Sequence, residues 1–304
     1  KAEQFDLATA CRGLGVDVVI LERCADLTEL ARDAVDRGAD VLGMAGGDGS
    51  LAYVAAVAAE HDLPFVCIPA GTRNHFALDI GLDRNDPRQA LAAFVDGEDR
   101  VIDYATANGR MFLNNVSLGV YAAIVEQDAY RDAKVETALQ MLPELMEKGG
   151  PHFDLHFDVP GHERLEQAAL LQVSNGSYDL TSGIGRRGSL TDGVLGVVTV
   201  DPQRTADLVG LTVLAAAGWA EHASALWSWS ASELIVESGQ PELAAGLDGE
   251  TIKLSTPLRF ATVAGGLTIR VPRGSRIGLT EQNLGTNGIY SGLLDVAFGR
   301  PTGT

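Results

Sequence analysis

The chain has 304 residues, of which 46% are hydrophobic and 21% charged, and its formal net charge at pH 7 is −18. This composition is typical of a soluble globular protein, and the length predicts two domains rather than one. The excess of acids argues against nucleic acid as the main partner, because a phosphate backbone needs a basic surface. For a similar reason, contact with an anionic membrane should use a local basic or apolar patch.

The cysteine content and the apolar segments indicate the compartment. The chain has 3 cysteines, an odd number, and no Cys-x-x-Cys. Such cysteines are typical of a reducing compartment, where they behave as small core residues. No signal peptide is recognisable, and the most apolar helical stretch, residues 208–220, is too short to span a bilayer. We expect a cytoplasmic protein without a transmembrane segment, peripheral to the membrane if it acts on lipid.

Residues 1–103 alternate helix-like and strand-like segments, as in β-α-β units. Helices are expected at residues 2–14, 28–35, 51–60 and 86–95. Strands are expected in the short apolar runs at residues 16–21, 41–45 and 64–68. Strands that are apolar throughout suit a parallel sheet covered on both faces, so we predict a Rossmann-like α/β domain. Such a domain more often begins with a strand, and we expect a first strand upstream of Lys1.

The second of these strands ends in a glycine-rich loop, Gly46-Gly47-Asp48-Gly49-Ser50. The glycines let the backbone turn sharply and expose its N–H groups. The helix that follows would present its positive dipole end to an anion. Asp48 would repel a bare phosphate, so either Mg²⁺ bridges the two or Asp48 faces another part of the site. A tight turn between a strand and a helix explains the same residues equally well.

A second polar loop, residues 69–77, follows the next expected strand and contains Gly71, Thr72 and Asn74. In parallel sheets, ligands bind beyond the carboxyl ends of the strands. Because both loops lie at such ends, we expect them to line one ligand-binding crevice.

From residue 101 onward the pattern becomes rich in β-strands. Asn108-Gly109, between the runs 101–107 and 111–116, predicts a hairpin with a type I′ turn. Further strands are expected at residues 153–159, 168–174, 194–200, 233–237, 251–254, 258–263 and 267–271. Helices are expected at residues 132–148 and 205–227. The second region is therefore predicted to be a mostly antiparallel β-sandwich.

The predicted organisation has an α/β nucleotide-binding domain at residues 1–103 and a β-rich domain at residues 104–272. Residues 273–304 are rich in glycine and either pack back on the first domain or form an extension. Exposed sheet edges are compatible with a homodimer. Arg186 and Arg187 follow a glycine-containing loop; contact with phosphate or lipid head groups is one interpretation, and a solvated loop is the expected one.

Four short motifs, in their joint order and spacing, resemble the diacylglycerol kinase catalytic-domain family, especially its bacterial soluble lipid kinases. They lie at residues 46–49, 69–77, 112–119 and 247–250. The resemblance implies a nucleotide-binding α/β domain followed by a β-rich domain, with the active site in the cleft between them. It also implies transfer of the ATP γ-phosphoryl group to a hydroxyl of diacylglycerol or a similar lipid, with ATP and Mg²⁺ as cofactors.

The resemblance also implies roles for individual residues. The nucleotide phosphates would be bound by Gly46, Gly47, Asp48, Gly49, Ser50, Gly71, Thr72 and Asn74. Asp48 would act through Mg²⁺ or by orienting the loop, and Ser50 could cap the helix.

Asp248 matches the family's general base, because an alcohol is a poor nucleophile until a carboxylate takes its proton. Glu250 would serve the nucleotide or the metal; in an extended segment it shares a face with Asp248. Without the resemblance, Asp248-Gly249 is better interpreted as a hairpin turn.

Two departures from the family pattern concern metal and nucleotide binding. Asp192 and the carbonyl of Val194 are candidates for a structural Mg²⁺, but Thr191 and Gly196 stand where relatives have acids. An ordinary turn is at least as good an interpretation. The family's first strand and its Asn-Pro-x-Ser-Gly-type loop, which contributes to the nucleotide pocket, are not found in the sequence.

Two other functions remain open. NAD kinases share the Gly-Gly-Asp-Gly loop and a β-rich second domain, so the acceptor could instead be soluble. Against this, no Asn-Glu pair follows the loop, and the later motifs fit lipid kinases better. The third possibility is a lipid- or nucleotide-binding relative that has lost turnover.

Overall fold

A computed structural model describes residues 5–21, 26–72, 74–119, 153–179, 186–200 and 226–277. The chain divides into two compact units, and both combine segments that are distant in sequence. Unit 1 comprises Lys1–Tyr104, Ser189–Gly193 and Val263–Thr280. Unit 2 comprises Ala105–Gly188, Val194–Thr262 and Glu281–Thr304. The domain boundaries expected at residues 103 and 272 stay a prediction.

The described helices all belong to unit 1. They are α1 (Leu7–Gly13), α2 (Leu27–Asp36), α3 (Asp48–Glu60), α4 (His75–Asp79), α5 (Pro87–Ala90) and α6 (Ala93–Asp96). Helix α2 begins after Asp26, whose carboxylate accepts hydrogen bonds from the N–H groups of Thr28 and Glu29. Such a cap satisfies amides that the helix itself leaves without partners. The single helix expected at residues 86–95 is instead two short helices.

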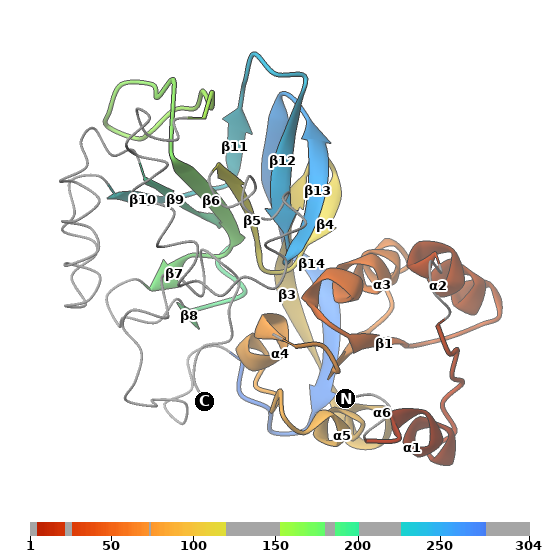
Figure 1. The fold of residues 1–304 in the computed structure, drawn as a ribbon. Helices are drawn as coiled ribbons and strands as arrows, with labels where there is room; N and C mark the ends of the chain where they lie inside the picture. Colours follow the sequence, from red (N-terminus) through yellow and green to blue (C-terminus); the bar gives the residue numbers. More distant parts are fainter. Residues whose placement is uncertain are drawn as a thin grey trace. The chain divides into compact units, whose positions relative to one another are not determined.

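Two adjacent parallel strands organise unit 1. Strand β1 (Leu42–Gly46) pairs in parallel with β2 (Phe65–Pro69), and Gly46 lies opposite Pro69. Strand β2 also pairs in parallel with β14 (Leu258–Pro272), through Ile269 and Phe65. Every residue of β2 is buried, as expected for a strand covered on both faces. Helix α3 packs against β1 and against α2, which Figure 1 shows beside it. The predicted α/β domain with parallel strands is confirmed.

Residues 16–21, which were expected to form a strand, do not form one. The side chains of Val19, Ile20 and Leu21 are 52%, 63% and 42% exposed. The β-branched residue types favour a strand, but a strand also needs a hydrogen-bonding partner. No residue in the described ranges pairs with this segment. The local apolar pattern was therefore an insufficient signal, because strand pairing is not a local property.

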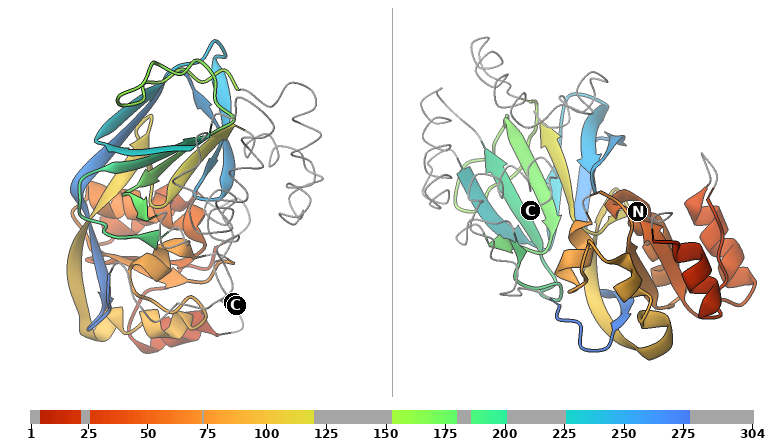
Figure 2. Two further views of the ribbon diagram at one scale, coloured as in Figure 1. Left: turned by 90° about the vertical axis from the view of Figure 1, so that its left-hand side faces the viewer. Right: turned by 60° about the horizontal axis from the view of Figure 1, so that its bottom comes forward.

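Unit 2 contains a six-stranded sheet with the order β10-β9-β6-β5-β12-β13. Its strands are β5 (Asn115–Gly119), β6 (Leu170–Asn175), β9 (Leu195–Val200), β10 (Leu226–Ala231), β12 (Glu242–Leu247) and β13 (Glu250–Ser255). All of its pairings are antiparallel. Figure 2 shows the green and teal strands β6, β9 and β10 lying side by side. The predicted second, antiparallel domain is confirmed.

A second sheet has the order β1-β2-β14-β3-β4, with β11 paired to β14. Its remaining strands are β3 (Gly97–Ala107), β4 (Arg110–Phe112) and β11 (Glu233–Val236). Strands β3 and β14 are long, and each contributes residues to both units. Between β3 and β4 the chain turns at Asn108 and Gly109, whose φ angles are 50° and 79°. These left-handed conformations are those of the predicted hairpin turn. A separate short pair joins β7 (Tyr178–Asp179) and β8 (Arg186–Arg187).

Several strand predictions for unit 2 need correction. The single strand expected at residues 111–116 is divided between β4 and β5, which belong to different sheets. Residues 153–159 pair through isolated bridges, and the two strands expected at 258–263 and 267–271 are one strand, β14. Trp227, expected at the end of a helix, lies in β10. The helix at 132–148, most of that at 205–227 and the tail beyond residue 277 lie outside the described residues.

The central strands of the antiparallel sheet separate apolar from polar residues with the period of two that strands impose. One face contributes fully buried apolar side chains to the core, among them Val116, Val173 and Val197. Each such side chain stabilises the fold by about 1.5–3 kcal/mol. Residues of the other parity, such as Ser117 and Gln172, are also buried but polar. The antiparallel sheet therefore has buried polar groups that need hydrogen-bond partners.

Candidate functional site

In unit 1, the two glycine-containing loops lie against each other at the carboxyl ends of β1 and β2. The N–H groups of Ala70 and Gly71 donate to the carbonyl oxygen of Gly46 at 3.1 and 2.9 Å. A Cβ atom on Gly71 would lie 2.3 Å from Cα of Gly47, and one on Gly46 would lie 2.2 Å from Oγ of Ser50. The atoms in the way at Gly71 belong to the backbone, so this approach of the two loops requires glycine there, whereas at Gly46 they are the ends of the Ser50 and Met44 side chains.

The side chain of Asn74 makes hydrogen bonds to the backbone of the second glycine loop. Its Oδ1 accepts from the Gly71 N–H at 3.0 Å, and its Nδ2 donates to the Gly71 carbonyl at 2.9 Å. The side chain is fully buried, and the backbone is left-handed with φ 56°. Thr72 is exposed. In this structure Asn74 therefore orders the backbone of Gly71, while its proposed contact with nucleotide stays a prediction.

Asp48 is the first residue of α3, and its carboxylate ties the glycine loop to α4. The N–H groups of His75 and Phe76 donate to its two oxygens, each at 3.1 Å, and the residue is 6% exposed. These amides begin α4 and have no partner within that helix. These hydrogen bonds agree with the expected role of Asp48 in orienting the loop, and its expected role through Mg²⁺ stays a prediction. Ser50 does not act as a helix cap, since its hydroxyl donates to the carbonyl oxygen of Gly47 at 2.8 Å.

The buried thiol of Cys67 on β2 is a neighbour of this acid. Burial and then the negative charge of Asp48 raise the pKa of the Cys67 thiol well above its usual value. Burial also raises the pKa of Cys11. Both cysteines are free and buried, as expected for inert core thiols. Cys24 lies outside the described residues.

The arrangement in unit 1 suits a phosphate group. Backbone N–H groups in a glycine-rich turn, followed at once by the first turn of a helix, form a common anion-binding structure. Helix α3 is 13 residues long and begins immediately after Gly47. A Cβ at Gly46 or Gly71 would collide with Ser50 Oγ or Gly47 Cα, so the glycines allow the two loops to lie against each other beside the start of this helix. The nucleotide-binding residues expected in unit 1 are thus brought together.

In unit 2, Asp248 and Gly249 form the two-residue turn between β12 and β13. Their φ angles are 48° and 86°, so the hairpin turn that the Asp-Gly pair suggests is present. Glu250 begins β13, lies opposite Leu247 and is exposed. Because Asp248 lies in the turn, it does not share a strand face with Glu250 as an extended segment would require. The assignment of Glu250 to nucleotide or metal stays a prediction.

The Asp248 carboxylate is 7% exposed and is bound by three consecutive backbone amides. Its Oδ2 accepts from the N–H of Leu113 at 2.8 Å. Its Oδ1 accepts from the N–H groups of Asn114 and Asn115 at 2.8 and 3.1 Å. Such hydrogen bonds to an ionised acceptor are strong. They also explain why the strand expected at residues 111–116 is interrupted at Leu113 and Asn114, since these two amides bind Asp248 between β4 and β5.

Arg187 completes this cluster, and the sequence does not reveal it. Expected on a solvated loop, Arg187 is instead 1% exposed. Its guanidinium donates to the carbonyl oxygens of Leu113 and Asn175 and to the side-chain oxygen of Asn114. A buried guanidinium is costly unless it is well hydrogen-bonded. An arginine pair after a glycine-containing loop gives no sign of burial, because the acceptors lie far away in sequence.

The segment expected to bind a structural Mg²⁺ is held by protein groups. Asp192 is exposed, and the neighbouring Gly193 N–H donates to Asp103 Oδ2 at 2.6 Å. The Val194 carbonyl accepts from the N–H of Gly176 at 3.0 Å. Within the described ranges, no group of three or more His, Cys, Asp or Glu side chains could hold a metal ion. The described donors do not make up a cation site, and the metal role of Asp192 and Val194 stays a prediction.

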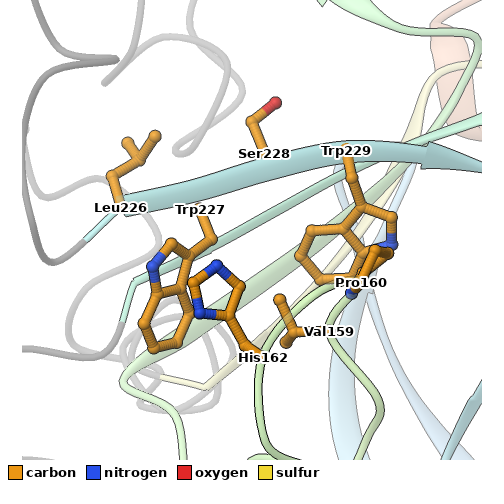
Figure 3. Close-up of a pocket in the computed structure, with 7 residues that line it drawn as sticks. All are labelled: Val159, Pro160, His162, Leu226, Trp227, Ser228 and Trp229. Carbon is orange, nitrogen blue, oxygen red and sulfur yellow. The ribbon is translucent and has the colours of Figure 1, made fainter.

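Unit 2 also has a groove of about 270 Å³ beside strand β10, with mostly apolar residues and two polar ones in its lining. It is lined by Val159, Pro160, His162, Leu226, Trp227, Ser228 and Trp229. Figure 3 shows the His162 ring facing the Trp227 indole; the two ring centroids are 5.3 Å apart. Trp229 stacks on Phe157 with centroids 6.4 Å apart. None of these lining residues is Asp, Glu, Lys or Arg.

These features define a class of two-unit proteins, with two contacting glycine loops on an α/β unit and an antiparallel unit that carries a buried acid. Residues 3–107 match the family model described as "Diacylglycerol kinase catalytic domain". This part of the chain is thus similar to the diacylglycerol kinase catalytic domain, as the motifs predict. The matched residues include both glycine loops and do not include Asp248 or Arg187.

Individual relatives agree with this assignment. A "Diacylglycerol kinase" of Mycobacterium tuberculosis is 36% identical over 92 residues, which are 30% of this chain and 30% of that protein. A "Probable lipid kinase YegS-like" of Pseudomonas aeruginosa is 27% identical over 265 residues, 82% of each chain. A solved structure of a diacylglycerol kinase from Bacillus anthracis str. Sterne is 18% identical, with a TM-score of 0.59 over 86% of both chains. This last similarity shows the fold.

Among the described residues, no helix is both long enough and apolar enough to cross a bilayer.

Proposed function

We propose that this protein is an ATP-dependent lipid kinase, which transfers the γ-phosphoryl group of ATP to a hydroxyl of diacylglycerol or a similar lipid. The observation that carries the proposal is the contact between the two glycine loops, where a Cβ on Gly71 would lie 2.3 Å from Gly47. Such a backbone surface at the start of α3 suits a polyphosphate. The match of residues 3–107 to a kinase catalytic domain supports the same activity.

In this proposal, unit 1 holds the nucleotide. The backbone N–H groups of Gly47 and Gly49 and the first turn of α3 bind the phosphates. Asp48 keeps α4 against the glycine loop through the amides of His75 and Phe76. Mg²⁺ bound with ATP supplies charge neutralisation of the phosphates.

Unit 2 supplies the base. A carboxylate within hydrogen-bond reach of the lipid hydroxyl can take its proton as the oxygen attacks phosphorus. Three amide hydrogen bonds hold the Asp248 carboxylate in a fixed orientation. A carboxylate is a sufficient base for phosphoryl transfer through a loose transition state, because the hydroxyl gives up its proton late.

We further propose that contact with the lipid surface uses the groove at Trp227 and Trp229. An acidic protein with a net charge of −18 gains little from an anionic surface. The groove has an uncharged lining and two indoles, and indoles favour the boundary between apolar and aqueous phases. The occupant that fits is therefore a bilayer of uncharged or zwitterionic lipids.

Phosphorylation of a panel of acceptors tests the activity. The purified protein is incubated with γ-labelled ATP, Mg²⁺ and, separately, diacylglycerol, monoacylglycerol, ceramide, sphingosine or NAD⁺. We expect label in one or more lipids. Label in NAD⁺ and in no lipid would instead show a kinase of a soluble acceptor. Binding of lipid or nucleotide, measured by calorimetry, without transfer to any acceptor would show a relative that has lost turnover.

A further inference from the structure

A buried cation and a buried anion in unit 2 are joined by a single peptide unit. The carbonyl of Leu113 and the N–H of Asn114 belong to the same planar amide. Arg187 Nη1 donates to that carbonyl oxygen, and the N–H donates to Asp248 Oδ1 at 2.8 Å. The hydrogen bonds therefore run from the guanidinium, through one amide, to the carboxylate.

Additional contacts fix the same peptide from the Arg187 side. Arg187 Nη2 donates to Asn114 Oδ1 at 3.1 Å, and Nη1 donates to the Asn175 carbonyl at 2.9 Å. The Asn175 N–H donates to the carbonyl oxygen of Asn114 at 2.9 Å. Leu113, Asn114 and Asn175 are 0%, 3% and 1% exposed. Because water is excluded, these hydrogen bonds are stronger than exposed ones and polarise one another.

We propose that Arg187 is a positioning residue for Asp248. It fixes the Leu113–Asn114 amide, which in turn fixes the carboxylate, and its charge polarises that N–H toward Asp248. The role rests on the proposed function, in which Asp248 is the base. The planar guanidinium donates hydrogen bonds to several acceptors in fixed directions, which a lysine ammonium cannot do. Its burial leaves no surface for the lipid head group that the sequence allowed as a partner.

The consequence for turnover follows from geometry. Residues 113–115 supply all three amides that hold Asp248. Without the guanidinium, the Leu113 carbonyl keeps only the long hydrogen bond from Asn175 Nδ2 at 3.4 Å, so the segment is held less firmly. A misplacement of the reacting groups by about 1 Å costs on the order of 100-fold in rate. Arg187 should therefore affect kcat more than the KM of either substrate.

Four variants test this role: Arg187→Met, Arg187→Lys, Asp248→Asn, and the double variant Arg187→Met with Asp248→Asn. Rates are measured with the lipid acceptor identified in the panel, together with the KM values and the melting temperature. We expect Arg187→Met to lower kcat by about 100-fold, with each KM changed by less than about threefold. Arg187→Lys should recover part of the rate, because it keeps the charge and loses the planar fork. In the Asp248→Asn background, Arg187→Met should have no further effect, because residues that act as a unit are not additive.

Thr199→Val is the matched control for a merely structural effect. The Thr199 hydroxyl is fully buried and donates to the carbonyl of Leu170 at 2.9 Å. Leu170 and Asn175 are the two ends of strand β6, so this bond lies at the other end of the strand from the cluster. We expect this variant to lower the melting temperature and to leave kcat unchanged.

Each alternative outcome overturns a distinct part of the account. If Arg187→Met melts earlier but keeps its kcat, Arg187 is structural and does not position the base. Equal losses of rate from Arg187→Met in both backgrounds would mean that Arg187 acts independently of Asp248. A wild-type rate for Asp248→Asn would exclude Asp248 as the base, and therefore also exclude Arg187 as its positioning residue. If Arg187→Met does not fold, Arg187→Lys decides: about a tenfold loss in kcat is expected, and an unchanged kcat contradicts the proposal.

Discussion

Asp48 in unit 1 and Asp248 in unit 2 are both buried acids beside glycines, and both bind the backbone of another segment. Asp48 is 6% exposed and Asp248 7% exposed. The partners of Asp48 lie 27 and 28 residues along the chain, whereas those of Asp248 lie 133 to 135 residues away. A buried carboxylate that accepts backbone hydrogen bonds therefore connects segments that are close in sequence in unit 1 and segments that are distant in sequence in unit 2.

The difference between the two acids lies in what supports the amides they bind. The amides that bind Asp48 start helix α4, so local chain geometry orients them. An amide that binds Asp248 is in turn held by the buried guanidinium of Arg187. The glycine loops of unit 1 thus depend on shape and close backbone contact. The acid of unit 2 depends on charge and on a hydrogen-bond network.

A substitution at Gly71 should disrupt the shape-based site and abolish ATP binding. In Gly71→Ala, the new Cβ would lie 2.3 Å from Gly47 Cα, so the loops must move apart. We expect the free energy of unfolding to fall by about 1–3 kcal/mol. We also expect that calorimetry will detect no ATP binding. Gly13→Ala is the control, because a Cβ there meets no atom within 4 Å. Equal ATP affinity in both variants would contradict the proposed phosphate cradle.

Removal of the Asp48 charge should separate loop support from nucleotide binding. An asparagine keeps one acceptor oxygen, so one amide of His75 or Phe76 loses its partner. We expect Asp48→Asn to lose about 1–3 kcal/mol of unfolding free energy in urea titrations and to bind ATP more weakly. Asp103 is the matched acid, since its carboxylate also accepts two backbone amides in unit 1.

Asp103→Asn should lose similar stability and keep its affinity for ATP. If both variants lose ATP affinity to the same extent, the effect comes from loss of folded structure, and Asp48 has no special place in the nucleotide site.

The lipid-contact proposal is sharpened by a comparison of two apolar residues in unit 2. Trp227 lines the groove, whereas Ile235 is 44% exposed and is not among the groove residues. We expect Trp227→Ala to weaken binding to phosphatidylcholine vesicles by about three- to tenfold, measured by flotation. Ile235→Ala should bind as the wild type does. Equal binding by the two variants would place the lipid contact elsewhere.

The smallest expected effect concerns the acid stability of unit 1. A hydrogen bond from Arg270 lowers the pKa of Asp99 below its usual value. A carboxyl of lowered pKa stabilises the fold above its ordinary pKa, and that stability is lost as the pH falls through the folded-state value. Because the Asp99 side chain is 42% exposed, solvent screening limits the effect to at most about 1 kcal/mol.

The measurement for Asp99 is urea unfolding at about pH 7 and about pH 3, on either side of the ordinary aspartate pKa. Asp99→Asn should lose less stability between these conditions than the wild type. An identical loss in both proteins would show that the ion pair with Arg270 contributes nothing measurable.

Features that depend on neighbouring residues could be predicted from the sequence. The glycine loops follow from the Gly-Gly-Asp-Gly run after an apolar strand, and the turn at Asp248 follows from its Asp-Gly pair. The helices α2 and α3 and the strands β1 and β2 also follow from local apolar patterns. In each case the residue types determine the backbone geometry directly.

Features that depend on distant partners could not be predicted. Residues 16–21 have strand-forming side chains but find no strand partner in the described ranges. The split of residues 111–116 follows from hydrogen bonds to Asp248, more than 130 residues away. The burial of Arg187 depends on acceptors in Leu113 and Asn175, which no local pattern connects to an arginine pair.

The most direct test of the central claim is the transfer of labelled γ-phosphate from ATP to lipid by the wild type and by Asp248→Asn, side by side. Asparagine also suits a type I′ turn before glycine, so rates are compared per folded molecule. The account predicts labelled lipid with the wild type and a rate lower by about 100- to 10,000-fold with Asp248→Asn. Equal rates of lipid phosphorylation by the two proteins would contradict it.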